Sequence, residues 1–178
     1  MDALQNRRVV TGHDDQGKAV FLVDDVLTSL NPVTGKPPGG STAGMANVYR
    51  TAGLPADING PFVDYYGQNI AFADESGATC RFCHFLPVKD LSEDKLNVVH
   101  RTESVDFGVV LKGQIELTLD DGVKKILRQG DVVVQQGTIH DWLNSFDEIC
   151  VMMFVLIPAK KFKVPKTGEL LEAMARPR

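Results

Sequence analysis

Residues 100–113 read HRTESVDFGVVLKG and residues 130–144 read GDVVVQQGTIHDWLN, and these two stretches decide the fold. Both alternate apolar and polar residues over short runs, the pattern of β-strands whose successive side chains point to opposite faces. Glycines at 113, 130 and 137 mark the turns between the runs. His100 and Thr102 are two residues apart, so one face of the first strand carries both.

The sequence on either side continues this alternation of short strands and turns. Predicted strands cover residues 79–86, 97–102, 106–111, 114–119, 123–127, 132–136, 140–144 and 148–157. The triplet at 120–122, Asp-Asp-Gly, predicts a hairpin turn. Strands this short, with turns about every ten residues, are typical of an antiparallel sandwich or barrel. The predicted fold class is therefore all-β, with one short helix expected over 168–175.

The first third of the chain has a different character. Residues 9–11 and 19–23 predict short strands around a polar turn, whereas residues 30–62 are rich in the Gly, Pro and Asn of loops. We therefore expect three segments. Residues 1–64 form an N-terminal extension that packs on the barrel or swaps with it, residues 65–158 form the barrel, and residues 159–178 form a tail with the short helix.

Composition and charge argue against several classes of function. The chain has 178 residues, enough for one domain, and a net charge of −4, which argues against nucleic acid or an anionic membrane as a partner. No apolar run approaches the ~20 residues of a membrane span, and no signal peptide is recognisable. Three cysteines, an odd number, predict free thiols in a reducing compartment, so a cytoplasmic location is expected.

The stretch Cys80-Arg81-Phe82-Cys83-His84 matches the C-x-x-C-H spacing of haem attachment. It also alternates as a strand, which places Cys80 and His84 on one face and Cys83 on the other. Since two cysteines on opposite faces of a sheet cannot hold one haem, we expect no haem, and no fingerprint of NAD or flavin binding is present. His84 remains a candidate catalytic acid or base, provided that its face lines the barrel interior.

The two opening stretches resemble the two sequence motifs of the cupin family. His100 takes the place of the first histidine of the first motif, and Asp106 takes that of its glutamate, six residues before Gly113. Thr102 stands where most members have a second histidine. The second motif is matched at Gly130, Gly137, His140 and Asn144, without its proline. The resemblance implies a single-domain cupin barrel, the double-stranded β-helix or jelly roll.

In most cupins three histidines and one glutamate hold a divalent metal, so the resemblance leaves His100, Asp106 and His140 as metal ligands here. Two imidazoles and one carboxylate suit non-haem Fe(II), which makes iron the preferred cofactor. Mn, Ni or Zn would serve as a Lewis acid on the same ligands. The alternative is a metal-free barrel in which hydrogen bonds satisfy both histidines.

Side chains beside these ligands are candidates for binding a substrate. Thr102 shares a face with His100, while Trp142 and Asn144 share a face with His140. Trp142 would wall the pocket or belong to the core. Either Gln135 or its neighbour can point inward and bond a substrate hydroxyl. The predicted substrate-binding set is Thr102, Gln136, Trp142 and Asn144.

A closer resemblance covers residues 100 to about 157. The patterns H-R-T-x-S-x-D at His100 and H-x-W-x-N at His140 resemble small single-domain cupins that include fungal oxidoreductases of secondary-metabolite clusters. This implies a metal-dependent oxidoreductase that tailors a small polyketide-like or aromatic metabolite. A redox-neutral decarboxylase, dehydratase or isomerase, and a non-catalytic small-molecule-binding cupin, are the alternatives. Cupins commonly pair through N-terminal strands, so a homodimer is also expected.

Overall fold

A computed structural model describes residues 4–32, 34–38, 43–68, 76–90 and 98–177 of the chain. These residues form β-strands, short 3-10 turns and loops, and no α-helix occurs among them. Nothing in this part of the chain is a helix long and apolar enough to cross a membrane. The all-β prediction is therefore confirmed.

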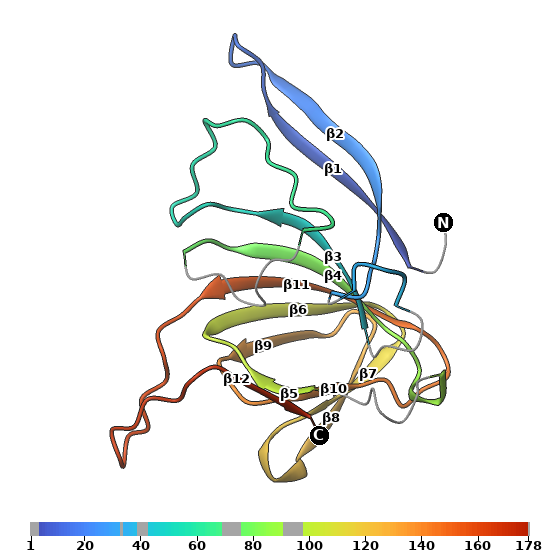
Figure 1. The fold of residues 1–178 in the computed structure, drawn as a ribbon, viewed down its shortest axis with the longest axis vertical. Helices are drawn as coiled ribbons and strands as arrows, with labels where there is room; N and C mark the ends of the chain where they lie inside the picture. The colour runs from blue at the N-terminus through green and yellow to red at the C-terminus, as the bar shows by residue number, and fades with distance from the viewer. Residues whose placement is uncertain (1–3, 33, 39–42, 69–75, 91–97, 178) are drawn as a thin grey trace.

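The larger of the sheets has five strands in the order β3-β4-β11-β6-β9, and all neighbours are antiparallel (Figure 1). Its strands are β3 (Ala43–Arg50), β4 (Thr79–Phe85), β6 (Ser104–Lys112), β9 (Val132–Gln136) and β11 (Cys150–Pro158). β11 is central because it is the most apolar strand, and Val, Met, Phe, Leu and Ile suit a strand buried between neighbours.

Shorter strands form the opposite wall of the barrel. β7 (Gln114–Thr118) lies between β8 (Lys124–Arg128) and β10 (Asp141–Leu143), while β5 (Val98–Arg101) pairs with β12 (Met174–Pro177). A backbone bridge between His100 and His140 joins these two groups of strands. The hydrophobic core draws on both walls, with Cys83, Phe85, Val110, Ile115, Leu117, Trp142, Cys150, Met152, Phe154 and Leu156.

The inner face of the five-stranded sheet changes from apolar to polar along its strands. The pairing register places Thr79, Leu156, Asp106 and Gln135 in one row across four strands. All four are buried, and three of them are polar. Rows further along carry the apolar core, so the interior has one polar end, and this is where a site with chemistry can form.

Two local predictions were wrong. The helix expected over 168–175 is absent, because the chain turns at Gly168, with a positive φ of 75°, and Met174–Pro177 then pairs with the edge of β5. β3 lies within the segment predicted to consist of loops. Its sequence begins Ala43-Gly44-Met45-Ala46, whose small residues give little alternation. Gly44 also lies in a tight place, since an added Cβ would be 3.0 Å from Pro38 and 3.1 Å from Ser29.

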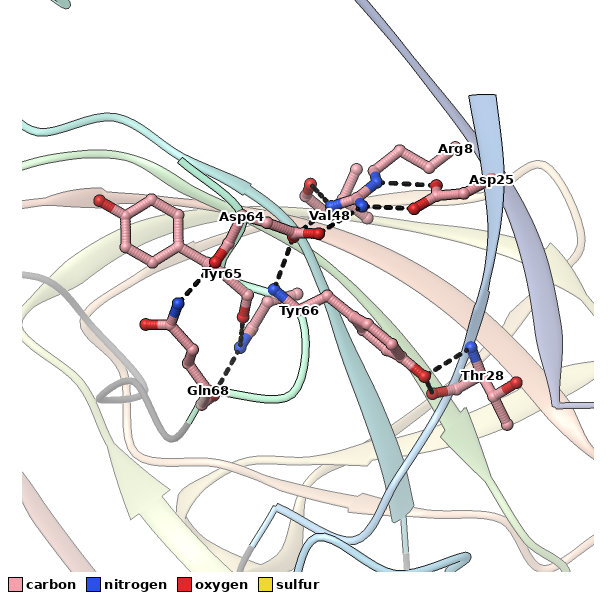
Figure 2. A network of polar contacts seen from close by, with 9 residues as sticks. Arg8, Asp25, Thr28, Val48, Asp64, Tyr65, Tyr66 and Gln68 are labelled. Atoms are coloured by element: carbon pink, nitrogen blue, oxygen red, sulfur yellow. Dashed lines mark hydrogen bonds and ion pairs between the residues drawn. The ribbon is translucent and has the colours of Figure 1, made fainter. Parts of the chain in front are cut away.

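The N-terminal hairpin of β1 (Gln5–His13) and β2 (Ala19–Thr28) extends beyond the sheets (Figure 1). Arg8 fastens it to the rest of the chain (Figure 2). The buried guanidinium donates to both carboxylate oxygens of Asp25, to both of Asp64, and to the carbonyl of Val48 in β3. These hydrogen bonds raise the pKa of Arg8 further above its usual value. One side chain therefore holds together three separate segments.

We predict that Arg8→Met lowers the free energy of unfolding by about 2 kcal/mol, because two partly exposed carboxylates lose their charged hydrogen bonds to a common cation. The neighbouring Arg7→Met is the matched control. Arg7 also forms a two-hydrogen-bond pair, with Asp24, but on the exposed side of the hairpin, where solvent screens the pair and its loss should change the stability little. Urea titrations, monitored by the fluorescence of Trp142, measure the free energy of unfolding of both variants. Equal effects of the two substitutions would contradict the assigned role of Arg8.

Candidate active site

Four predicted site residues meet at the polar end of the barrel, on the ends of β5, β6 and β10. His100 and His140 exchange two backbone hydrogen bonds of 2.9 Å, which sets their side chains next to each other. Their ring centroids are 4.2 Å apart, with the planes at 60°. Asp106 and Thr102 approach the same region from β6 and the residues just before it.

The Asp106 carboxylate is buried, with 5% of the residue exposed, and is held by hydrogen bonds on both oxygens. The Ser104 hydroxyl donates to Oδ1 at 2.5 Å and lies 2.8 Å from Thr102 Oγ1. The Gln135 amide donates to Oδ2 at 3.3 Å. Burial raises the pKa of Asp106, and the hydrogen bonds from Ser104 and Gln135 act in the opposite direction.

His140 presents a neutral imidazole with one nitrogen fixed and the other facing the cluster. Its Nδ1 lies 2.9 Å from the Thr138 carbonyl, which can only accept, so Nδ1 carries the proton. Its Nε2 lies 3.2 Å from the Gln135 amide nitrogen, which can only donate, so Nε2 offers its lone pair. Burial lowers the pKa of His140 to about 4, in keeping with the neutral ring.

The predicted metal ligands His100, Asp106 and His140 all lie in this cluster. Among the described residues, no group of three or more His, Cys, Asp or Glu side chains is placed to hold a metal ion. The Gln135 amide nitrogen donates to both Asp106 Oδ2 and His140 Nε2. A ligated metal would need these two atoms about 2.0–2.2 Å from its centre, with no N–H between them. The side chains as arranged therefore do not fit a metal held by His100, Asp106 and His140.

The prediction that Gln136 binds substrate was wrong. It is exposed and lies opposite Val105 on the outer face of the sheet, whereas Gln135 is 4% exposed and lies opposite Asp106 on the inner face. Alternation made one of the two glutamines inward-facing, but the sequence did not say which. The register between β6 and β9 decides it.

Trp142 and Asn144 are both buried, and they have different surroundings. The Trp142 ring packs edge-on against the rings of His140 and Phe154, so it belongs to the core and also borders the cluster. The Asn144 amide donates to the carbonyls of Phe85 and Glu148, and its oxygen accepts from the Phe146 backbone. Its hydrogen bonds therefore hold a turn.

His84 is not brought together with the cluster. Its neighbours in β4, Cys83 and Phe85, belong to the core, so His84 points to the outer face of the sheet. There its Nδ1 shares a 2.7 Å hydrogen bond with the hydroxyl of Ser29, at the end of β2, and both residues are at most 1% exposed. The sequence indicated which residues share a face with His84, but not that this face is the outer one.

Sequence reasoning did not identify two polar residues near the cluster. Ser104 follows Thr102 by two residues and precedes Asp106 by two, so the alternation that linked His100 with Thr102 would also have found it. Arg81 is 4% exposed and shares the inner face of β4 with Cys83. Burial lowers the pKa of Arg81, while the nearby Cys83 and Asp106 act to raise it.

A cavity of about 250 Å³ lies at the edge of the smaller wall and reaches His140. Its size is slightly below the usual range for ligand pockets, which suits a small molecule. The cavity is lined by Val99, Thr118, Leu119, Asp120, Asp121, Gly122, Ile139, His140 and Asp141.

The chain matches one family model and several known proteins. The family model described as Cupin domain matches residues 92–156. The cupin-domain-containing oxidoreductase virC of Hypocrea virens is 32% identical over 86% of this chain and 76% of its own length. The cupin-domain-containing oxidoreductase fogC of Aspergillus ruber is 31% identical over 84% of this chain and 71% of its own length. The phomopsin biosynthesis cluster protein C' of Diaporthe leptostromiformis is 33% identical over 92% of this chain and 83% of its own length.

The buried His84 predicts a dependence of stability on pH. Burial lowers the pKa of His84 from 6.5 to about 4, so the unfolded chain binds a proton that the folded chain excludes. This contribution is complete above about pH 6.5 and is lost as the pH falls toward 4, by about 3 kcal/mol at ~1.4 kcal/mol per pKa unit.

The variant His84→Asn, which can keep a hydrogen bond to Ser29, is expected to show a shallower loss of stability between pH 6.5 and 4.5 in urea titrations. Part of the dependence of stability on pH will remain, because burial also lowers the pKa of His140. His13→Asn, at the exposed end of β1, is the control and should match the wild type. If the free energy of unfolding of His84→Asn fell with pH as steeply as that of the wild type, His84 would not be the source of the pH dependence.

Proposed function

The chain belongs to the cupin family, and on this premise we propose that it is an oxidoreductase that tailors a small polyketide-like or aromatic secondary metabolite. Two of its relatives carry the name oxidoreductase, and each matches more than four fifths of the chain. A third is named for the biosynthesis cluster of phomopsin. These names support the type of reaction and its setting in secondary metabolism, and the substrate class is our proposal.

The observation that carries the proposal is the hydrogen-bonded chain from Asp106 through Gln135 to His140, buried at the polar end of the barrel. Oxidation of an alcohol or phenol requires that its hydroxyl proton leave. His140 Nε2, whose lone pair faces the cluster, is the group that would accept this proton once the substrate hydroxyl takes the place of the Gln135 amide. The Asp106 carboxylate nearby would stabilise the imidazolium that forms, and burial strengthens this interaction by reducing screening.

The electrons need a separate acceptor, because amino-acid side chains do not take up an electron pair from an alcohol. The prediction of a divalent metal, with iron preferred, concerns this part of the reaction. Since Gln135 separates the predicted ligands, metal dependence stays a prediction. Metal analysis of protein purified without chelators, in the wild type and in His100→Ala and Asp106→Ala, is the direct measurement.

The proposed activity predicts a defined mass change in the substrate. Incubation of the protein with a panel of aromatic alcohols and phenols, with and without added Fe(II) and oxygen, should yield a product that has lost two hydrogens or gained oxygen. Asp106→Asn and His140→Gln should reduce its formation by roughly 100-fold, the usual contribution of a proton-transfer group. Gln136→Ala, on the outer face, should retain full activity.

Other outcomes would reject this proposal in favour of an alternative. A product lacking carbon dioxide or water, or an isomer of the substrate, would indicate the redox-neutral decarboxylase, dehydratase or isomerase. Binding of a compound at the cluster with no product from the whole panel, under every condition, would indicate a non-catalytic binding protein.

We also propose that the protein is a homodimer formed through its N-terminal hairpin. The hairpin exposes Val9, Phe21, Leu22 and Val26, and Phe21 is 77% exposed. Light scattering should give twice the mass of the chain, and Phe21→Asp should shift it toward the monomer. Val123→Asp alters an exposed apolar residue just after the turn that leaves β7, and should leave the mass unchanged. A monomeric wild type would refute the proposal.

A further inference from the structure

The Gln135 side chain occupies the point between the two best-placed metal donors of the cluster. Its amide nitrogen is 3.3 Å from Asp106 Oδ2 and 3.2 Å from His140 Nε2, and both contacts are hydrogen bonds in which the amide donates. An amide nitrogen carries two protons, so the two bonds use both of them. Neither donor atom can then bind a metal without losing its hydrogen bond to Gln135.

The orientation of this amide follows from its surroundings. Turning it over would place the amide oxygen against the Asp106 carboxylate, where two acceptors would face each other. As it stands, the amide oxygen of Gln135 has no hydrogen-bond partner in the described part of the chain. The two bonds to Asp106 and His140 are therefore the polar contacts that hold this buried side chain in place.

We propose that Gln135 is a positioning residue that stands in the place of a metal and must move away before one can bind. It sets the geometry of Asp106 and His140 when no metal is present, and it makes Nε2 the unprotonated nitrogen of His140. The Thr138 carbonyl completes this arrangement by accepting from Nδ1. A histidine held in this way at Nδ1 is also prepared to bind a metal through Nε2.

This role of Gln135 rests on the proposed function, which places the reaction at the cluster. Its consequence is a change in the affinity for a divalent metal, which can be measured without product formation. Removal of the Gln135 amide leaves Asp106 Oδ2 and His140 Nε2 facing the same space with no proton between them. A divalent metal then enters without breaking two hydrogen bonds. The affinity for metal should therefore rise when Gln135 is shortened.

The test is an anaerobic titration of the full chain with Co(II), whose absorption spectrum reports its ligands, followed by competition with a chromophoric chelator. Gln135→Ala is expected to bind Co(II) at least about tenfold more tightly than the wild type, equivalent to about 1.4 kcal/mol. Adding His140→Gln to Gln135→Ala should remove the gain, which locates the metal at the cluster. Gln136→Ala is the control and should match the wild type.

A second variant keeps the test decisive if Gln135→Ala does not fold. Gln135→Glu retains the shape of the side chain but replaces the donor with a carboxylate, and it should also bind Co(II) more tightly. The proposal is overturned if the variant that folds binds no more tightly than the wild type, or if the wild type retains stoichiometric metal through dialysis. Since the titration measures no product, such a result would leave the proposed oxidoreductase activity standing, and absence of product would leave this inference standing.

Discussion

Placing the Asp106 carboxylate inside the barrel costs free energy that only hydrogen bonds and nearby positive charge can offset. Its neighbours are polar for this reason: Ser104 and Gln135 donate to its oxygens, and Arg81 shares the same interior. Further along the strands, the interior is filled by aromatic and aliphatic side chains with no such requirement. The polar end of the barrel thus gathers the groups that stabilise the buried Asp106 carboxylate.

The backbone bridge between His100 and His140 gives this polar end its second wall. Among the described strands, β5 is otherwise paired with β12, and β10 with β7. The bridge fixes the two imidazoles at 4.2 Å, and the edge-on contact of His140 with Trp142 connects them to the core. Strand pairing, rather than a flexible loop, therefore determines the spacing of the histidines.

Much of this arrangement could be predicted from the sequence. The all-β class followed from short alternating runs, and the family and the grouping of His100, Asp106 and His140 followed from the resemblance to the two cupin motifs. Alternation separates the two faces of a strand but does not say which is inside. Gln136 was therefore chosen where Gln135 lies inward, and His84 was considered for a cavity it does not face. Those choices depend on pairing with distant strands, which local sequence does not encode.

The stretch that contains His84 shows how a misleading pattern arises. Its C-x-x-C-H spacing matches a haem motif, yet the two faces of β4 serve different partners. Cys83 and Phe85 contribute to the core, whereas His84 contacts Ser29, which follows the N-terminal hairpin. Arg8 fastens the same hairpin to β3 and to Asp64. Since β3 and β4 are paired, these contacts hold the hairpin along one edge of the sheet, and His84 takes part in them rather than in the cluster.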